Sequence, residues 1–372
     1  MLLEACRLAF DDDAPRLVWA DEIGGERGEL VVLQCDLARG GLAPADVAAR
    51  RARERELLQR HAVAWSGVHT YGRFEFRRGF VEALQVDLDV FVSCADAIFE
   101  AAPLLRSVTV DGPKPLPGGG PPSLASFEQL LELPAFWRLH RLGVFAAGGR
   151  YPLGNQIATL LVDAGALGQL TALDISSSSI GGPGIAALTG SGQLEQLDEL
   201  WLRRHHCRDD SLVEMLGAAR QLRSLALVGP HSVVALAQAL PALRSLQIDN
   251  VEHGGLDALA RSPAARTLTS LRLGGLALHD PHFERFPALV ELDLYLQPVT
   301  GPIGQLPRLR RLRLAPSTTV DDALAIARPL GGQLERLDLR GARVPEERRA
   351  ELADLVAGEL QTGPASDMPP ML

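Results

Sequence analysis

The chain has 372 residues, of which 47% are hydrophobic and 22% charged, and its net charge is −9. This length exceeds the usual size of one domain, so the sequence predicts either several compact domains or one elongated array of repeats. The hydrophobic content excludes a wholly disordered protein. The negative charge argues against a nucleic-acid partner, because such binding depends on clustered cations that neutralise phosphates.

Hydropathy and cysteine spacing indicate where in the cell the protein is expected to lie. No stretch approaches the roughly 20 apolar residues that a membrane-spanning helix needs, and the N-terminus lacks the basic and apolar parts of a secretory signal. Cys6, Cys35, Cys94 and Cys207 are spaced too widely for a zinc ribbon or a disulfide framework. Reduced thiols in a cytosol are the preferred interpretation. We therefore expect a cytoplasmic protein with no membrane partner.

The first part of the chain, residues 1–66, lacks any repeat and is predicted to be helical. Helices are expected over 14–24, 26–39 and 44–65, the last of them starting on a proline, which suits a first helical turn. Residues 67–102 are predicted to connect these helices to the first repeat unit. Alternating apolar residues between 73 and 89 predict a strand or a hairpin within this connection.

A repeated LxxLxL core dominates residues 103–344. Its steps run from 34 residues, between Val108 and Leu142, down to 20 residues, between Leu292 and Leu312. The final LxL alternates like a strand with one buried face, and helix-compatible stretches such as 184–189, 211–219 and 233–240 lie between cores. Each unit therefore predicts one strand and one short return element, with fewer helices after about residue 280, where the units shorten.

Three further segments interrupt or end the array. Residues 112–123 hold too many prolines and glycines for a helix or strand, and predict a loop that either binds a partner or is slack. Residues 345–360 predict a helix that caps the last unit. Residues 361–372 predict a mobile tail.

The repeated cores resemble those of leucine-rich repeat proteins. Residues 170–197 follow the longer form of that repeat closely, with a strand, a turn containing Ile180, and a helix. The usual asparagine of the turn is absent; its place is taken by Ser178, His205, Pro230, Val251, Leu276 and Gln297. The resemblance implies an α/β solenoid of about ten ribs, a horseshoe with a concave parallel sheet, capped by the N-terminal helices.

Residues 11–40, 52–67 and 74–84 together resemble the bacterial repeat-companion domain, a small module that precedes leucine-rich repeats in myxobacterial and planctomycete proteins. Arg16, Leu17, Ala20, Asp21 and the 28–34 stretch correspond to its most recognisable run. The resemblance implies a bacterial repeat protein and no catalytic activity.

Catalytic and ligand-binding motifs are scarce in the sequence. It has no phosphate-binding loop, no GxSxG turn and no HExxH helix. The segment 203–210 holds His205, His206, Cys207 and two aspartates, but successive residues of an extended chain point to opposite faces, so a zinc site is not expected. Cys207 also begins a CxD sequence seen in some bacterial ubiquitin ligases that carry leucine-rich repeats. We expect no catalytic residue, cofactor or metal.

The remaining candidate site is the surface of the sheet. Residues between and after the last two apolar positions of each core are expected on the concave face, which an open solenoid leaves without intramolecular cover. Trp, Tyr and Arg on such a face are typical anchors of protein interfaces. The predicted partner-binding residues are Asp174, Trp201, Arg203, Gln247, Asp249, Arg272, Asp293, Tyr295 and Arg313.

The sequence thus predicts a non-catalytic binding module or scaffold for a protein partner. Two alternatives stay open: an enzyme such as a ligase built on Cys207, or a regulatory subunit of an enzyme complex. A further possibility is that the N-terminal helices, not the sheet, hold the partner. A simpler interpretation of the predicted site is that Trp201 covers neighbouring aliphatic residues and that the charges pair across strands.

Overall fold

A computed structural model describes residues 2–114, 122–145, 153–176, 178–203, 209–231, 243–251, 254–274, 278–279, 283–296, 299–300 and 303–363. The chain divides into two compact units, Met1–Ala187 and Leu188–Leu372. Each unit builds parallel strands in sequence order with helices or short 3-10 turns between them. The predicted α/β leucine-rich repeat fold is confirmed.

The first unit begins with four helices, as the sequence predicts for three of them; the first, α1, was not expected. A hairpin of two strands follows, and then strands that alternate with helices. The elements are α1 Leu2–Leu8, α2 Ala14–Ile23, α3 Gly25–Arg39, α4 Pro44–Ser66, β1 Gly72–Arg77, β2 Phe80–Asp87, α5 Leu88–Ala101, β3 Ser107–Asp111, α6 Ala125–Glu132, η1 Phe136–Arg138, β4 Arg141–Phe145, α7 Gly154–Asp163, η2 Ala166–Gly168, β5 Ala172–Asp174 and α8 Gly182–Gly190.

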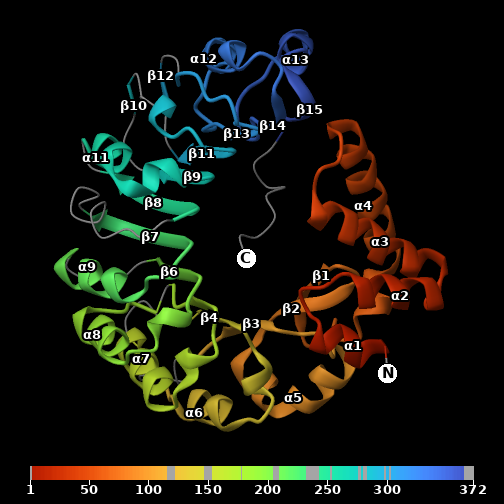
Figure 1. The fold of residues 1–372 in the computed structure, drawn as a ribbon, viewed down its shortest axis with the longest axis vertical. Helices are drawn as coiled ribbons and strands as arrows, with labels where there is room; N and C mark the ends of the chain where they lie inside the picture. The colour runs from red at the N-terminus through yellow and green to blue at the C-terminus, as the bar shows by residue number, and fades with distance from the viewer. Residues whose placement is uncertain are drawn as a thin grey trace. The chain divides into compact units, whose positions relative to one another are not determined.

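The parallel register begins before the first recognisable LxxLxL core. Strand β2 pairs antiparallel with β1 but parallel with β3, and β3 pairs parallel with β4. Helix α5 connects β2 to β3, and Figure 1 shows it on the same side of the strands as α6 and α7. The hairpin therefore supplies the first strand of the repeat sheet, although its sequence lacks the motif.

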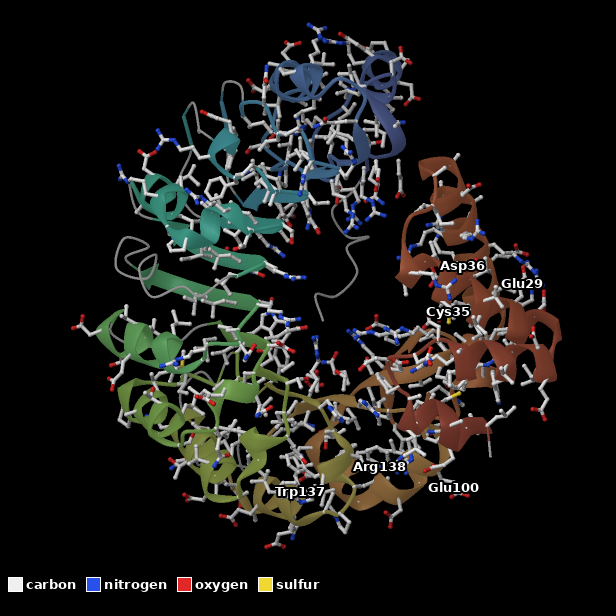
Figure 2. The ribbon with its side chains drawn as sticks, viewed as in Figure 1. Glu29, Cys35, Asp36, Glu100, Trp137 and Arg138 are labelled. Atoms are coloured by element: carbon white, nitrogen blue, oxygen red, sulfur yellow. The ribbon has the colours of Figure 1, made fainter. Side chains whose placement is uncertain are left out.

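Helices α3 and α4 are joined by ion pairs along their facing sides. Arg53 of α4 reaches Glu29 at 2.8 Å, and Arg50 reaches Asp36 at 3.3 Å. Figure 2 labels Glu29, Cys35 and Asp36, all three on α3. The Cys35 side chain is fully buried, and this burial raises the pKa of its thiol to about 12.

A buried ion pair ties the N-terminal helices to the sheet. Arg16 of α2 lies 2.7 Å from the Glu82 carboxylate of β2, and the two side chains are 0% and 8% exposed. The Arg16 guanidinium also donates a hydrogen bond to the Phe10 carbonyl and lies over the rings of Phe10 and Phe80. Since burying an unpaired charge is costly, this pair makes the packing of α2 on β2 specific.

The second unit repeats the strand-and-return pattern to the end of the described chain. Its elements are η3 Leu194–Gln196, β6 Glu199–Arg203, α9 Asp209–Ala218, β7 Ser224–His231, β8 Ser245–Val251, α11 Gly255–Arg261, η4 Pro263–Arg266, β9 Ser270–Gly274, β10 Leu278–His279, η5 Phe283–Arg285, β11 Glu291–Leu296, β12 Val299–Thr300, β13 Arg311–Arg313, α12 Val320–Ala327, η6 Arg328–Leu330, β14 Leu334–Asp338, α13 Glu346–Ala353 and β15 Val356–Gln361.

The leucines of the repeated cores form the interior. In β11 and β13, Leu292, Leu294 and Leu312 are 1% exposed or less. Figure 1 shows α9, α11 and α12 on one side of the strands of the second unit, and no described helix of that unit on the other side. The buried leucines are assigned to the helix-covered side because they are shielded from solvent. The opposite face is therefore free of helical cover over the described strands.

Near the end of the repeat array, the return element follows the length of the unit. In the described residues between 283 and 309, η5 is the one helical turn, as expected for units of 20 and 21 residues. Helix α12, however, lies in the 25-residue step from Leu312 to Leu337, where the longer unit has room for it. The expectation of fewer helices after about residue 280 therefore holds for the described part of the short units and does not extend to this longer unit.

The C-terminal cap differs from the prediction of one helix over 345–360. Helix α13 ends at Ala353, and residues 356–361 form β15, which pairs parallel with β14. Gly358 allows this approach, because a Cβ there would lie 2.3 Å from the Glu335 carbonyl oxygen. The strand also accepts a hydrogen bond from the Leu339 amide at 2.8 Å. The exposed backbone of β14 thus favours a strand over the expected helix.

Candidate protein-binding face of the sheet

The helix-free face of the second unit carries one side chain from each strand in a continuous line. These residues are paired in register from β6 to β14, and we call them the central row: Trp201, Ala226, Gln247, Arg272, Asp293, Arg313 and Asp338. They alternate with buried leucines along each strand, so they project from the opposite face. The sequence predicted these positions correctly as neighbours, because the repeat fixes the register.

The C-terminal half of the central row is a ladder of alternating charges. Arg272 lies 3.6 Å from Asp293, whose carboxylate is also 3.5 Å from Arg313. Arg313 in turn lies 3.5 Å from Asp338, and Asp338 lies 2.7 Å from Arg340. The side chains of these residues are only 7–17% exposed. Each of these charges is therefore already neutralised by neighbours on the sheet.

An aromatic ring lies beside this ladder. The Arg313 guanidinium lies 4.0 Å from the centre of the Tyr295 ring, and the Tyr295 amide donates a hydrogen bond of 2.9 Å to Asp293. Tyr295 itself is partly buried. Stacking of this kind fixes the guanidinium, because the ring face attracts cations.

The N-terminal half of the central row is uncharged. Trp201 and Gln247 are partly buried, while Ala226 between them is fully buried. Two residues beyond the central row, the backbone of Arg203 pairs with that of Val228, but the Arg203 side chain lies outside the described residues. Asp249 is partly buried in β8. The central row thus changes from uncharged residues, between Trp201 and Gln247, to paired charges from Arg272 onward.

Asp174, the remaining predicted contact, belongs to the first unit. Its carboxylate accepts a hydrogen bond of 2.8 Å from the Ser176 amide at the end of β5. Its register neighbours in β4, β3 and β2 are Gly143, Thr109 and Gln85. Within the first unit, Asp174 is therefore the last of four residues paired in register across β2, β3, β4 and β5.

A pocket of about 420 Å³ lies on the first unit, at the ends of β2 and β3. His69, Tyr71, Arg73, Gln85, Asp87 and Asp111 are among the residues that line it. This site was not predicted from the sequence, although Val86–Asp87 and Val110–Asp111 repeat the same two letters one strand apart. In-register pairing places the two aspartates side by side.

The segment with His205, His206 and Cys207 lies outside the described residues, as does most of the predicted 112–123 loop. In the part of the chain that the structure describes, no group of three or more histidine, cysteine, aspartate or glutamate side chains is arranged to hold a metal ion. Over the same described ranges, no helix has the length and apolar character needed to cross a membrane.

The charge ladder makes the stability of the second unit sensitive to acid. Burial raises the pKa of Asp338, but hydrogen bonds from the Arg340 side chain and backbone, with the charges of Arg340 and Arg313, outweigh it and hold the pKa below its ordinary 3.8. A lowered folded-state pKa stabilises the fold above the unfolded-state pKa, and this stabilisation is lost as pH falls through the folded-state value.

We therefore expect thermal stability to fall as pH is lowered from 5 through about 3.8 and below. In Asp338→Asn the drop over the same range should be smaller, because the amide does not titrate. Circular dichroism melting curves at each pH measure both proteins. Equal losses in both would contradict a role for Asp338.

Comparison with known proteins gives no match to a protein-family model and none to a curated protein. Among solved structures, the chain is similar to an internalin of Listeria monocytogenes at 12% identity, covering 71% of this chain and 77% of that one, with a TM-score of 0.34. It is similar to a chain of the Rad7 and Elc1 complex in yeast at 13% identity, covering 95% and 93%, with a TM-score of 0.48.

The leucine-rich repeat protein LegL7 of Legionella pneumophila is similar at 12% identity, covering 75% of this chain and 82% of that one, with a TM-score of 0.34. A likeness of this degree concerns the path of the backbone. It assigns no role to any side chain of the sheet.

Proposed function

We propose that this chain is a non-catalytic interaction module or scaffold that binds a protein partner on the helix-free face of its repeat sheet. The observation that carries the proposal is the central row, where seven strands of the second unit present side chains in register on a face that no described helix of that unit covers. Rigid strands hold such side chains in place, so little conformational entropy is lost on binding.

Within the proposed interface we assign different roles to the two halves of the row. Arg272, Asp293 and Arg313 are paired with one another, so they would set the orientation of a partner rather than supply most of the affinity. Trp201, in the neutral half, is the proposed anchor, because a partly buried Trp presents a large rigid surface. Arg203, Gln247, Asp249 and Tyr295 complete this interface on the second unit, and Asp174 is proposed as a separate contact on the first unit.

The test is quantitative capture of partners from native lysate by the intact protein and by Trp201→Ala. Truncation of an interface anchor costs about 2 kcal/mol or more, so we expect retention of the true partner to fall at least about tenfold. Trp137→Ala is the matched control, since Trp137 is 46% exposed in η1 of the first unit and lies outside the proposed face.

A triple variant with Trp201→Ala, Arg203→Glu and Tyr295→Ala extends the same test over the face. A partner that binds this variant and the intact protein equally, with both folded by circular dichroism, overturns the proposal. Recognition would then lie elsewhere, for example on the N-terminal helices, where Val18, Ile23 and Val63 are 49–59% exposed. Deleting these helices is a poor test, because it would leave Glu82 without Arg16.

The alternative that the chain is an enzyme using Cys207 can be tested by alkylation of its cysteines. A catalytic thiolate at Cys207 would react with iodoacetamide far faster than an ordinary thiol. The described cysteines Cys6 and Cys35 provide the slow reference within the same chain, because both are buried and burial raises the pKa of each thiol.

A further inference from the structure

The pocket at the ends of β2 and β3 holds two carboxylates in fixed positions. Asp87 accepts hydrogen bonds from the Asp89 and Val90 amides at 3.0 and 3.3 Å, which anchors it at the start of α5. Asp111 accepts from the Gln85 amide nitrogen at 3.1 and 3.2 Å, one contact to each oxygen. Neither carboxylate therefore needs to reorganise to receive a cation.

One cation already lies at this site. The Lys114 ammonium contacts the Asp87 carboxylate, and the Lys114 side chain is otherwise 62% exposed. Lys114 is the single lysine of a chain with 37 basic residues. The contact places an ammonium group, at the end of an aliphatic stem, against Asp87.

Of the two carboxylates in the pocket, only Asp87 has a cation at ion-pair distance among the described residues. The hydrogen bond from Lys114 lowers the pKa of Asp87, so that this carboxylate stays ionised at neutral pH. In the described part of the chain, no cation lies within ion-pair distance of Asp111, although Arg73 lines the same pocket. Lys114 thus pairs with only one of the two neighbouring carboxylates, and Asp111 retains the capacity to accept from a cation.

We propose that this pocket receives a lysine or arginine side chain of a protein partner. Its cationic end would lie between Asp87 and Asp111, and its aliphatic stem would run along the partly buried Tyr71. Lys114 occupies part of this position in the free protein and competes with the incoming side chain. The proposal deepens the proposed function, on which it rests, by assigning a charge to the partner.

Butylammonium chloride is a direct probe, because it reproduces the end of a lysine side chain without requiring the partner. Binding is followed by the chemical shift of the Gln85 side-chain amide in TROSY spectra, with sodium chloride adjusted to keep ionic strength constant. We expect a weak, saturable shift in the intact protein. Lys114→Ala should bind about fivefold more tightly, which corresponds to removal of one competing surface ion pair.

Two further variants make the test specific. Lys114→Ala combined with Asp111→Asn should lose the saturable shift, while α5 keeps its Asp87 cap and the fold is preserved. Arg285→Ala is the matched control, since it removes the cation 3.3 Å from the exposed Asp257 and makes the same change in net charge. It should leave the shift of Gln85 unchanged.

The proposal is overturned if no saturable shift appears at Gln85, if Asp111→Asn has no effect, or if Arg285→Ala tightens binding as much as Lys114→Ala does. Because the probe is a small amine, these outcomes do not depend on Trp201 or on any captured protein. Failure at this pocket and failure of the proposed interface are therefore distinguishable.

Discussion

The Arg16→Met variant is expected to unfold about 3–5 kcal/mol more easily than the intact protein, which is the usual cost of breaking a buried ion pair by removing one partner. The side chain is fully buried, and Glu82 has no other cation as close in the described structure. Methionine fills most of the volume but leaves the carboxylate unpaired. Urea denaturation followed by circular dichroism measures the loss.

The pH dependence of the unfolding free energy distinguishes two causes of the loss in Arg16→Met: the unpaired Glu82 charge and the altered packing. Burial raises the pKa of Glu82, and Arg16 counteracts part of that rise. Without Arg16 the carboxyl should bind a proton more readily, so the penalty should be smaller at pH 5 than at pH 7.5. The double variant Arg16→Met with Glu82→Met should recover much of the stability, because replacing a whole buried pair by apolar residues is often neutral. An equal penalty at both pH values would contradict this explanation.

Leu292→Ala is expected to cost about 2–5 kcal/mol, the range for truncating a fully buried leucine. Leu292 is 0% exposed and lies in β11 between β9 and β13. Because a repeat contacts only its neighbours, the loss should be local. Hydrogen exchange followed by mass spectrometry should show faster exchange in β9, β11 and β13, and little change in β2 and β3.

The control for Leu292→Ala is the adjacent substitution Glu291→Ala. Glu291 pairs with Arg311 at 3.3 Å, with both side chains about half exposed, and such surface pairs contribute little. The free energy of local opening, obtained from the exchange rates, should therefore fall by less than about 1 kcal/mol. If both variants accelerate exchange equally, the leucine positions do not carry the stability of the ribs.

The repeat is the part of the fold that the sequence predicts best. A leucine pattern fixes which side of each strand is buried, and parallel stacking then fixes the register, so the neighbours of Trp201 and Asp293 follow from spacing alone. The N-terminal helices were also predictable, since Pro44 and Gly40 mark ends that the structure retains. Gly28 in the companion-like run has a physical reason as well: a Cβ there would lie 2.4 Å from the Ala20 carbonyl oxygen.

The remaining features depend on contacts that spacing does not specify. β15 forms because β14 would otherwise leave backbone groups unpaired, whereas the local sequence 345–360 favours a helix. The pocket combines the loop before β1 with β2 and β3, and the hairpin lacks the motif that would have extended the row to Gln85. The pairing of Arg313 with both Asp293 and Asp338 follows from the register, but the burial of these charges does not.

The strands at the margins of the two units bear on self-association. β1 carries Arg73, Glu75 and Arg77, and its pairing with β2 is interrupted by a bulge between Glu75 and Phe76. β15 carries Glu359, paired with Arg336, and contains Gly358. Charged, irregular or glycine-containing edges discourage the addition of another strand. We therefore expect these two edges to disfavour edge-to-edge pairing between copies of the chain.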